Sequence, residues 1–179
     1  LSCLGGLLSP DRGAVLLGGA PLANLSGQER ARHLGYLPQS PDLAWDMTVA
    51  TLTALGRLPW RTSRDRDAAA VAQALQQLDM AAFSDRPVSR LSGGERARAH
   101  LARVLAGQPR WLLADEPLAN LDLAHAGQLL GLLRELARGG AGVVLVLHDL
   151  ASAMNCADRV LVLHEGRLVA DGAPSDALA

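Results

Sequence analysis

The sequence predicts an α/β fold in which a core of parallel strands is interrupted by a helical insert. Two apolar segments, Trp111–Ala114 and Gly142–Leu147, have the length of buried strands, and the amphipathic segment Leu123–Arg138 lies between them. A strand, a helix and a second strand in this order are typical of parallel pairing. Between about Asp46 and Arg86 nearly every pattern is helical, which predicts the insert.

The elements before and within the insert are short. Apolar Leu1–Leu8 is predicted to be the tail of a helix that ends near the Pro and Gly residues of 9–13. Ser26 is a predicted N-cap, because Glu29 stands at the third helical position as in a capping box. The other predicted strands and helices of this half are Ala14–Leu17, Gly27–Arg32, Leu34–Leu37, Thr48–Leu55 and Asp65–Leu78.

The second half of the chain also contains N-cap residues, a turn signal and apolar runs that predict helices and strands. Ser92 is a good N-cap for a helix that runs from about Gly93 to Ala106. The dipeptide Glu165-Gly166 between two apolar runs predicts a hairpin turn. The remaining predicted elements are Asp149–Cys156, Val160–Leu163, Leu168–Ala170 and Pro174–Leu178.

The composition makes several function classes improbable on physical grounds. The chain has 179 residues and a formal net charge of -1, with its charges interspersed, so no polybasic surface for nucleic acid or anionic lipid is expected. Cys3 and Cys156 have no metal-binding spacing, and we expect two reduced thiols. No apolar run approaches the roughly 20 residues that cross a bilayer.

Two adjacent carboxylates, Asp115 and Glu116, follow the apolar strand Trp111–Ala114. They lie at the carboxyl end of a predicted parallel strand, which is the edge where ligands bind in such sheets. One carboxylate can hold Mg²⁺ while its neighbour orients a water for attack on a phosphate. The alternative is a pair of solvated acids at the end of a strand.

The segment Leu91-Ser92-Gly93-Gly94-Glu95 begins a predicted helix. Its two glycines leave backbone N–H groups accessible at the positive end of the helix dipole, which suits an anion. The alternative is an ordinary capped helix without a ligand.

The order of five segments resembles the motif set of ABC-type ATPases, and the resemblance covers essentially the whole chain. The segments are Tyr36-Leu37-Pro38-Gln39, which is similar to the family's Q-loop, Leu91–Glu95, Trp111–Pro117, Asn120-Leu121-Asp122 and His148-Asp149. The pentapeptide Leu91–Glu95 alone is fairly specific, and the five segments in this order are very specific. The resemblance implies a P-loop NTPase-like parallel sheet core without its N-terminal strands, with a helical subdomain over about 46–107 of a single domain, 1–179.

The resemblance also implies catalytic roles. Gln39 would sense Mg²⁺ and the attacking water, Asp115 would hold Mg²⁺, Glu116 would be the general base and His148 would contact the γ-phosphate of ATP. Phosphoryl transfer needs charge neutralisation and an oriented water, so each role is chemically reasonable. Considered alone, Gln39 is a loop amide and His148 a histidine at the end of a strand.

Other implied roles concern a second subunit. The segment Ser92, Gly93, Gly94 and Glu95 would bind ATP that the opposite subunit holds. Asp122, in the D-loop Ala119–Asp122, would lie at the dimer interface. Asn120 stands in this loop where many relatives have a small residue, and we expect little consequence.

The family's phosphate-binding loop, Gly-x-x-x-x-Gly-Lys-Ser/Thr, does not occur in these 179 residues, which contain no lysine. Leu1–Gly13 resembles the segment that directly follows that loop. We therefore expect the chain to begin just past it, and to fold poorly and bind ATP weakly as it stands.

Within the family, Met47-Thr48-Val49 and Ala54–Trp60 resemble importers of iron–siderophore complexes, haem and cobalamin, and similar strings occur in importers of phosphonate, zinc and manganese. This implies ATP and Mg²⁺ as cofactors, a homodimer on a transmembrane permease, an indirect link to a periplasmic or extracellular substrate-binding protein, and a peripheral location on the cytoplasmic face of the bacterial inner membrane. The alternatives are an inactive truncated cassette without a P-loop and a non-transport ABC ATPase.

Overall fold

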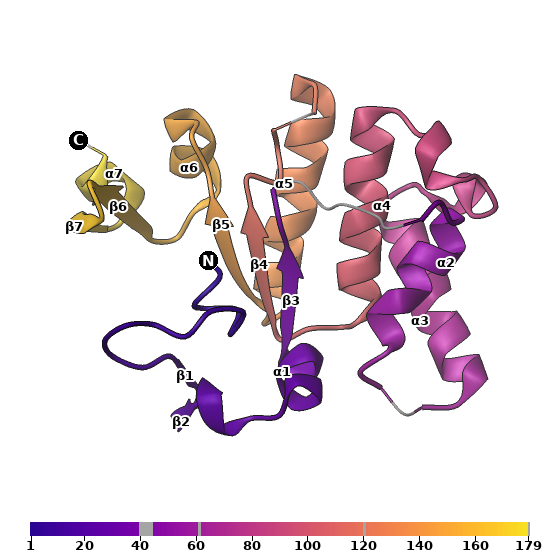
Figure 1. Cartoon of the computed structure of the whole chain (residues 1–179). Helices are drawn as coiled ribbons and strands as arrows, with labels where there is room; N and C mark the ends of the chain where they lie inside the picture. Colours follow the sequence, from indigo (N-terminus) through magenta and orange to yellow (C-terminus); the bar gives the residue numbers. More distant parts are fainter. Residues whose placement is uncertain (40–44, 61, 120, 179) are drawn as a thin grey trace.

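The computed structural model describes residues 1–39, 45–60, 62–119 and 121–178. A parallel sheet lies at its centre, a group of helices lies on one side of this sheet, and a β-hairpin lies on the other (Figure 1). Among the described residues, no helix combines the length and apolar character needed to cross a membrane.

The central sheet has the order β3-β4-β5, and both of its pairings are parallel. Its strands are β3 (Leu34–Leu37), β4 (Trp111–Asp115) and β5 (Gly142–Val146). Trp111 pairs with Gly142, where a Cβ would lie 2.1 Å from the indole ring, so any other residue at this position would require the Trp111 side chain to move. The predicted parallel pairing of the two apolar strands is confirmed.

Helix α5 (Leu123–Arg138) connects β4 to β5 and buries Leu129 and Leu133 in the core. Helix α1 (Gly27–His33) precedes β3 and begins with the predicted capping box, in which the Ser26 N–H donates to Glu29 Oε2 at 2.8 Å. Both helices thus end where a strand of the central sheet starts. Helix α6 (Leu150–Cys156) follows β5.

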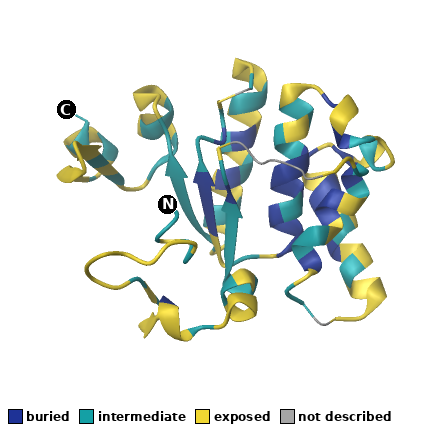
Figure 2. Ribbon diagram, viewed as in Figure 1, coloured by how far each residue is buried: buried dark blue, intermediate teal, exposed yellow. Residues whose placement is uncertain are grey.

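The helical insert forms one compact group in which α4 contacts α2, α3 and β3. Its elements are α2 (Val49–Ala54), η2 (Leu55–Arg57), α3 (Arg64–Gln77), η3 (Ala81–Phe83), η4 (Val88–Arg90) and α4 (Gly93–Ala106). The core lies between these helices and the sheet, where the ribbon is mostly buried (Figure 2). Leu52, Met80 and Leu101 are its largest fully buried apolar side chains.

Two small hairpins lie outside the central sheet. In the first, β1 (Leu16–Leu17) pairs with β2 (Ala20–Pro21), and the short helix η1 (Leu22–Asn24) follows. In the second, β6 (Val160–His164) pairs with β7 (Arg167–Gly172), and α7 (Pro174–Ala177) follows. The turn residues of the second have φ of 47° and 73°, as the predicted Glu165-Gly166 turn requires.

The helix tail predicted for Leu1–Leu8 is wrong in extent, because this segment is a single hydrogen-bonded turn. The Leu7 N–H donates to Ser2 O at 2.9 Å, and the Gly6 N–H donates to Cys3 O at 3.1 Å. Gly6 has φ of +68°, so these bonds form the glycine-terminated cap that ends helices. The chain therefore leaves the helical turn at Gly6 and not at the Pro and Gly residues further on.

Candidate functional site

The central sheet brings together the ends of its three strands. Gln39 lies two residues beyond β3, Glu116 one residue beyond β4 and His148 two residues beyond β5. Because the strands are parallel, these three positions share the carboxyl edge of the sheet. Residues that are far apart in the sequence thus meet at one place.

Glu116 joins the other two side chains through both of its carboxylate oxygens. Gln39 Nε2 donates to Glu116 Oε2 at 2.7 Å, and His148 Nε2 lies 2.6 Å from Glu116 Oε1. The Glu116 side chain is 19% exposed, whereas that of His148 is 78% exposed. The carboxylate is therefore held at the bottom of the cluster, and the imidazole covers it from the solvent side.

The backbone at Glu116 has an unusual conformation that positions this carboxylate. Its φ is +50°, in the left-handed region that non-glycine residues seldom adopt. The Glu116 N–H donates to Val146 O at 3.1 Å, which continues the pairing of β4 with β5 by one residue. Such conformations cost about 1–3 kcal/mol and cluster at functional sites.

Asp115, the last residue of β4, is half-buried beside this cluster. Gln39 uses its amide nitrogen on Glu116, which leaves its amide oxygen available to a cation. A carboxylate and an amide oxygen are hard ligands that suit Mg²⁺, which proteins hold through one or two carboxylates together with substrate phosphates. The described residues contain no cluster of three or more His, Cys, Asp or Glu side chains that could hold a metal. These donors therefore fit a Mg²⁺ ion that a phosphate also binds.

The segment Leu91–Glu95 forms the start of α4 through a capping box. The Ser92 N–H donates to Glu95 Oε2 at 2.8 Å, and the Glu95 N–H donates to Ser92 Oγ at 3.3 Å. The hydrogen bond from the Ser92 backbone, followed by that from the Ser92 side chain, lowers the pKa of Glu95. The carboxylate of Glu95 is thus used within its own helix, whereas Gly93 and Gly94 present the N–H groups that could face an anion.

Two further aspartates fix loops around the strand ends. Asp122 caps α5 by accepting from the His125 N–H at 2.9 Å, and Nδ1 of the same histidine lies 2.8 Å from its carboxylate. The backbone bond from His125 is the main reason that the pKa of Asp122 is lowered. Asn120 of the predicted D-loop lies outside the described residues.

Asp149 belongs to the predicted His148-Asp149 segment but was given no role of its own, and it anchors the loop between β5 and α6. Its carboxylate accepts from the Ala151 N–H at 3.1 Å and from the Ser152 N–H at 2.9 Å, which caps α6. The hydroxyl of Ser152, followed by these backbone bonds, lowers the pKa of Asp149. The signal in the sequence was an aspartate followed three residues later by serine at a helix start. This cap holds the peptide next to His148 in place.

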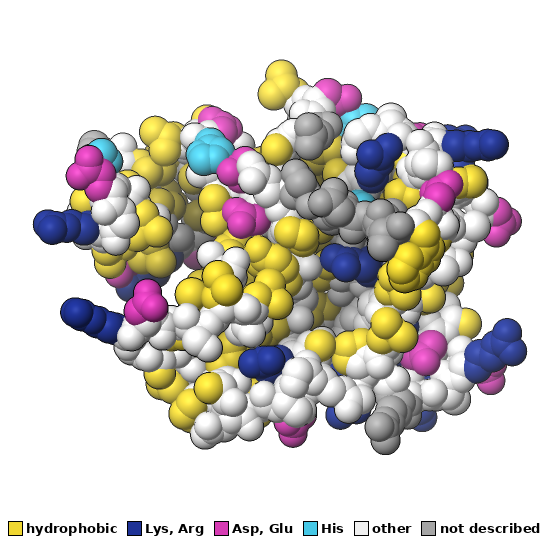
Figure 3. Space-filling view, viewed as in Figure 1, with side chains coloured by type: hydrophobic (Ala, Val, Ile, Leu, Met, Phe, Trp, Pro, Cys, Tyr) yellow, Lys and Arg dark blue, Asp and Glu magenta, His cyan; other side chains and the backbone are white. Residues whose placement is uncertain are grey.

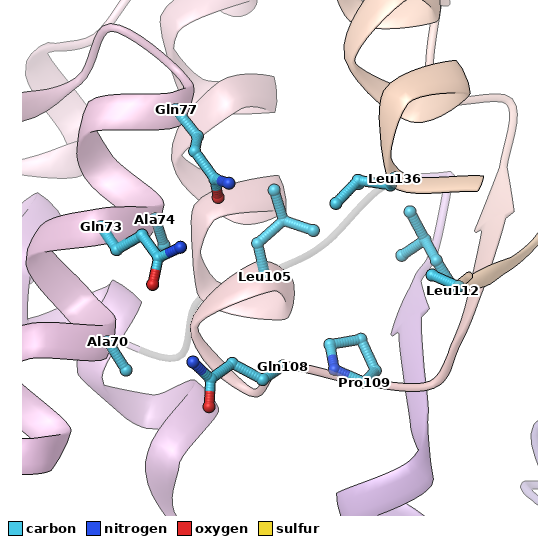
Figure 4. A pocket seen from close by; sticks show the side chains of 10 residues that line it. Ala70, Gln73, Ala74, Gln77, Leu105, Gln108, Pro109, Leu112 and Leu136 are labelled. Carbon is cyan, nitrogen blue, oxygen red and sulfur yellow. The ribbon is translucent and has the colours of Figure 1, made fainter. Parts of the chain in front are cut away.

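The molecular surface shows where the candidate site and a separate cavity lie. In Figure 3, acidic and histidine side chains lie close together above the end of the sheet, beside a hollow with largely hydrophobic walls. A separate cavity of about 220 Å³ lies at the opposite end of β4, between α3, the end of α4 and the end of α5 (Figure 4). Its lining is Ala70, Gln73, Ala74, Gln77, Leu105, Gln108, Pro109, Leu112, Leu136 and Ala141. None of the predicted site residues borders it.

Comparison with known sequences finds relatives that all belong to one family. The family described as ABC transporter matches residues 1–119. The haemin import ATP-binding protein HmuV of Streptomyces coelicolor is 47% identical over 99% of this chain, and the protein of the same name from Pseudomonas putida is 45% identical over 99%. The chain spans 66% of the length of the Streptomyces relative and 62% of that of a Rhodococcus jostii relative.

Solved structures of similar fold belong to transporters. The structure of cbiO1 from Clostridium perfringens, part of an ABC transporter complex, has a TM-score of 0.84 and 26% identity, and the match covers 97% of this chain and 71% of that one. An inward-facing ABC transporter of the metal-chelate type has a TM-score of 0.74 and 27% identity, with 80% of this chain and 59% of that one covered.

Proposed function

Because the chain belongs to the ABC transporter family, we propose that it is the ATP-binding and ATP-hydrolysing subunit of an importer for haem or a related substrate, such as an iron–siderophore complex or cobalamin. Support for the substrate class comes from the relatives, which are named as haemin import ATP-binding proteins. Support for ATP hydrolysis comes from the cluster at the carboxyl edge of the sheet.

The observation that carries the proposal is the pair of contacts on Glu116. An ionised carboxylate has about four lone-pair sites, so Gln39 and His148 leave one site on each oxygen for a water. Glu116 is held in one orientation by two donors and by its own backbone. It accepts a proton from that water as the water attacks, which is the role of a general base.

The neighbouring residues have supporting roles. Asp115 and the amide oxygen of Gln39 would hold Mg²⁺, which supplies charge neutralisation on the phosphates when it is bound. His148 contacts Glu116 in this structure, and it would contact the γ-phosphate once ATP is bound. Ser92, Gly93 and Gly94 present the start of α4 to ATP held by another subunit, and Asp122 contacts that subunit.

The assembly follows from these roles. Two copies of the subunit would bind each other across ATP, on a transmembrane permease at the cytoplasmic face of the bacterial inner membrane. A substrate-binding protein delivers the substrate to that permease. Within the subunit, we assign 1–179 to one ABC ATPase domain and about 46–107 to its helical subdomain.

Transport measurements test the proposal. We define the P-loop-extended chain as this chain preceded by a strand and a Gly-x-x-x-x-Gly-Lys-Ser segment of the family type. It is combined with its partner permease in proteoliposomes, and uptake of haem, a ferric siderophore and cobalamin is followed with ATP or ADP on the side of the ATP-binding subunit. We expect ATP-dependent uptake of haem. Hydrolysis without uptake of any of the three would contradict the importer function, and absence of hydrolysis would favour an inactive cassette.

A further inference from the structure

A tryptophan of the helical insert is contacted by two arginines. Trp60 lies in the segment between η2 and α3, and the guanidinium carbons of Arg57 and Arg32 lie 5.1 Å and 5.7 Å from the centre of its ring. A guanidinium at this distance over an indole face is attracted by the charge distribution of the ring. Arg57 belongs to the insert, whereas Arg32 belongs to α1, which leads into the central sheet. The ring therefore joins the insert to the sheet side of the molecule.

Hydrogen bonds from α1 hold the same segment. Arg32 Nε donates to Pro59 O at 2.8 Å, and Gln28 Nε2 donates to the same oxygen at 2.9 Å. Arg32, Pro59 and Trp60 are half-buried, so these contacts are partly shielded from water. One carbonyl group of the insert thus accepts two side-chain donors from α1. We call the four residues Gln28, Arg32, Pro59 and Trp60 the Trp60 clamp.

The Trp60 clamp also holds the carboxyl end of α4. Trp60 Nε1 donates to Gly107 O at 2.9 Å, and Arg57 Nη1 donates to Ala106 O at 3.0 Å. Carbonyl groups at this end of a helix have no partner within the helix, so these donors satisfy them. Arg57 is 7% exposed, and its Nε donates to Asp67 of α3 at 2.8 Å. The clamp therefore connects α1 to the last turn of α4 through a well-ordered set of donors.

Packing between α4 and the sheet is close at one point and interrupted beside it. A Cβ at Gly35 of β3 would lie 2.5 Å from the side chain of Val104, so helix and strand touch near the carboxyl end of α4. The cavity of about 220 Å³ that Gln108 and Pro109 border lies next to this contact (Figure 4). Close packing resists displacement and a cavity does not, so packing alone does not fix the angle between α4 and the sheet.

The other end of α4 carries the Leu91–Glu95 segment. The helix has 14 residues, so its two ends are roughly 20 Å apart at a rise of about 1.5 Å per residue. A Cβ at Gly94 would lie 3.4 Å from the Leu121 side chain, which places the start of α4 beside the D-loop. Over this length a tilt of about 3° at one end moves the other by about 1 Å. A misplacement of about 1 Å can cost about 10²-fold in rate.

We propose that Arg32 and Trp60 are positioning residues for ATP hydrolysis, because they fix the tilt of α4 and thereby the place of the Leu91–Glu95 segment against the ATP of the second subunit. This inference rests on the proposed function, since it requires that segment to meet ATP across a dimer. The two residues act through α4 and not on nucleotide. Their loss should therefore lower kcat and ATP-dependent pairing, while the affinity of a single subunit for ATP stays unchanged.

The experiment compares variants of the P-loop-extended chain. The test variants are Arg32→Met, Trp60→Leu and the two together, and Arg32→Lys is the conservative variant that keeps a cation and a donor. Arg30→Met is the matched control, because Arg30 is also half-buried on α1 and its side chain lies beside Gly6. Steady-state phosphate release gives kcat, fluorescent nucleotide binding gives the affinity for ATP, and light scattering with ATP gives the extent of pairing. Urea unfolding establishes that each variant is folded.

We expect Arg32→Met and Trp60→Leu each to lower kcat about tenfold and to weaken pairing, with the affinity for ATP within about twofold. Arg32→Lys should stay within about threefold of the unchanged kcat, and Arg30→Met within about twofold. The double variant should lose about tenfold as well, because both changes break one contact.

Three results would overturn the inference alone: an unchanged kcat in both single variants, an equal loss in Arg30→Met, or losses that multiply to about a hundredfold in the double variant. The first would place the Trp60 clamp in the fold only, and the other two would mean general damage to the protein. Absence of hydrolysis by the P-loop-extended chain itself would instead contradict the proposed function.

Discussion

His148 Nε2 lies 2.6 Å from Glu116 Oε1, although 32 residues separate them in the sequence. The contact exists because β4 and β5 are parallel neighbours, so the residues after each strand meet at one edge. The Asp149 cap fixes the peptide after His148, and the positive φ of Glu116 turns its carboxylate toward the imidazole. Two local features of the backbone thus create one contact between distant residues.

Replacement of this imidazole should impair hydrolysis. We expect His148→Ala in the P-loop-extended chain to lower kcat about 10²–10³-fold, because the side chain that contacts Glu116 here and would contact the γ-phosphate is lost. His164→Ala, an exposed histidine at the end of β6, is the control and should keep kcat within about twofold. Steady-state phosphate release measures both. Equal activity of the two variants would remove His148 from the site.

Gly56 should not tolerate a side chain. A Cβ at this position would lie 1.9 Å from the backbone oxygen of Arg103, so α4 and η2 would have to separate. We expect Gly56→Ala to lower the free energy of unfolding by about 1–3 kcal/mol or more, as overpacked cores do. Gly127→Ala is the matched control, because nothing lies within 4 Å of its Cβ in α5. Alanine is the better helix former, so this change should stabilise by up to about 1 kcal/mol. Urea unfolding measures the free energy of unfolding of both variants and shows whether it falls for Gly56→Ala and rises for Gly127→Ala.

His100 should make stability depend on pH. Its pKa is about 4 in the folded chain against an ordinary value of 6.5, so between these values the unfolded state binds more protons. The stability that the neutral imidazole contributes to the free energy of unfolding is fully present above pH 6.5 and is lost as the pH falls through 4. We expect the unchanged chain to lose more free energy of unfolding between about pH 7 and about pH 4.5 than His100→Gln does. The carboxylates titrate in both proteins, so their effect cancels, and equal losses would contradict the account.

The two capping serines offer a matched comparison. Ser92→Ala and Ser26→Ala each remove one capping box, and each should cost about 0.5–2 kcal/mol of stability. Only Ser92→Ala should lower ATP hydrolysis of the P-loop-extended chain, because only the start of α4 is placed against nucleotide in the proposed dimer. If both variants retain full activity, the Leu91–Glu95 segment acts in the fold alone.

The sequence predicted the elements well where periodicity and caps agree. The helices that begin after Ser92 and at Leu123 have the expected bounds, because each combines an apolar stripe with a side-chain cap. The end of the first turn at Gly6 was missed, since two adjacent glycines are equally permissive and only the structure shows which has positive φ.

The candidate site was predicted as a set of residue types and not as a set of contacts. The resemblance to ABC-type ATPases indicated Gln39, Glu116 and His148, but a pattern carries no information on which oxygen each donor meets. The left-handed backbone of Glu116 and the cap at Asp149 depend on the loops after β4 and β5. The burial of the His100 imidazole could not be inferred at all, because it arises from packing between α4 and distant segments.

The central claim is that Glu116 is the general base, and ATP hydrolysis by Glu116→Gln tests it most directly. The amide retains the size of the carboxylate but cannot accept a proton, so kcat of the P-loop-extended chain should fall by about 10²–10⁴-fold. Affinity for ATP, measured by fluorescent nucleotide binding, should stay within about threefold, because binding depends on other groups. A variant that binds ATP and hydrolyses it at the unchanged rate would contradict the account.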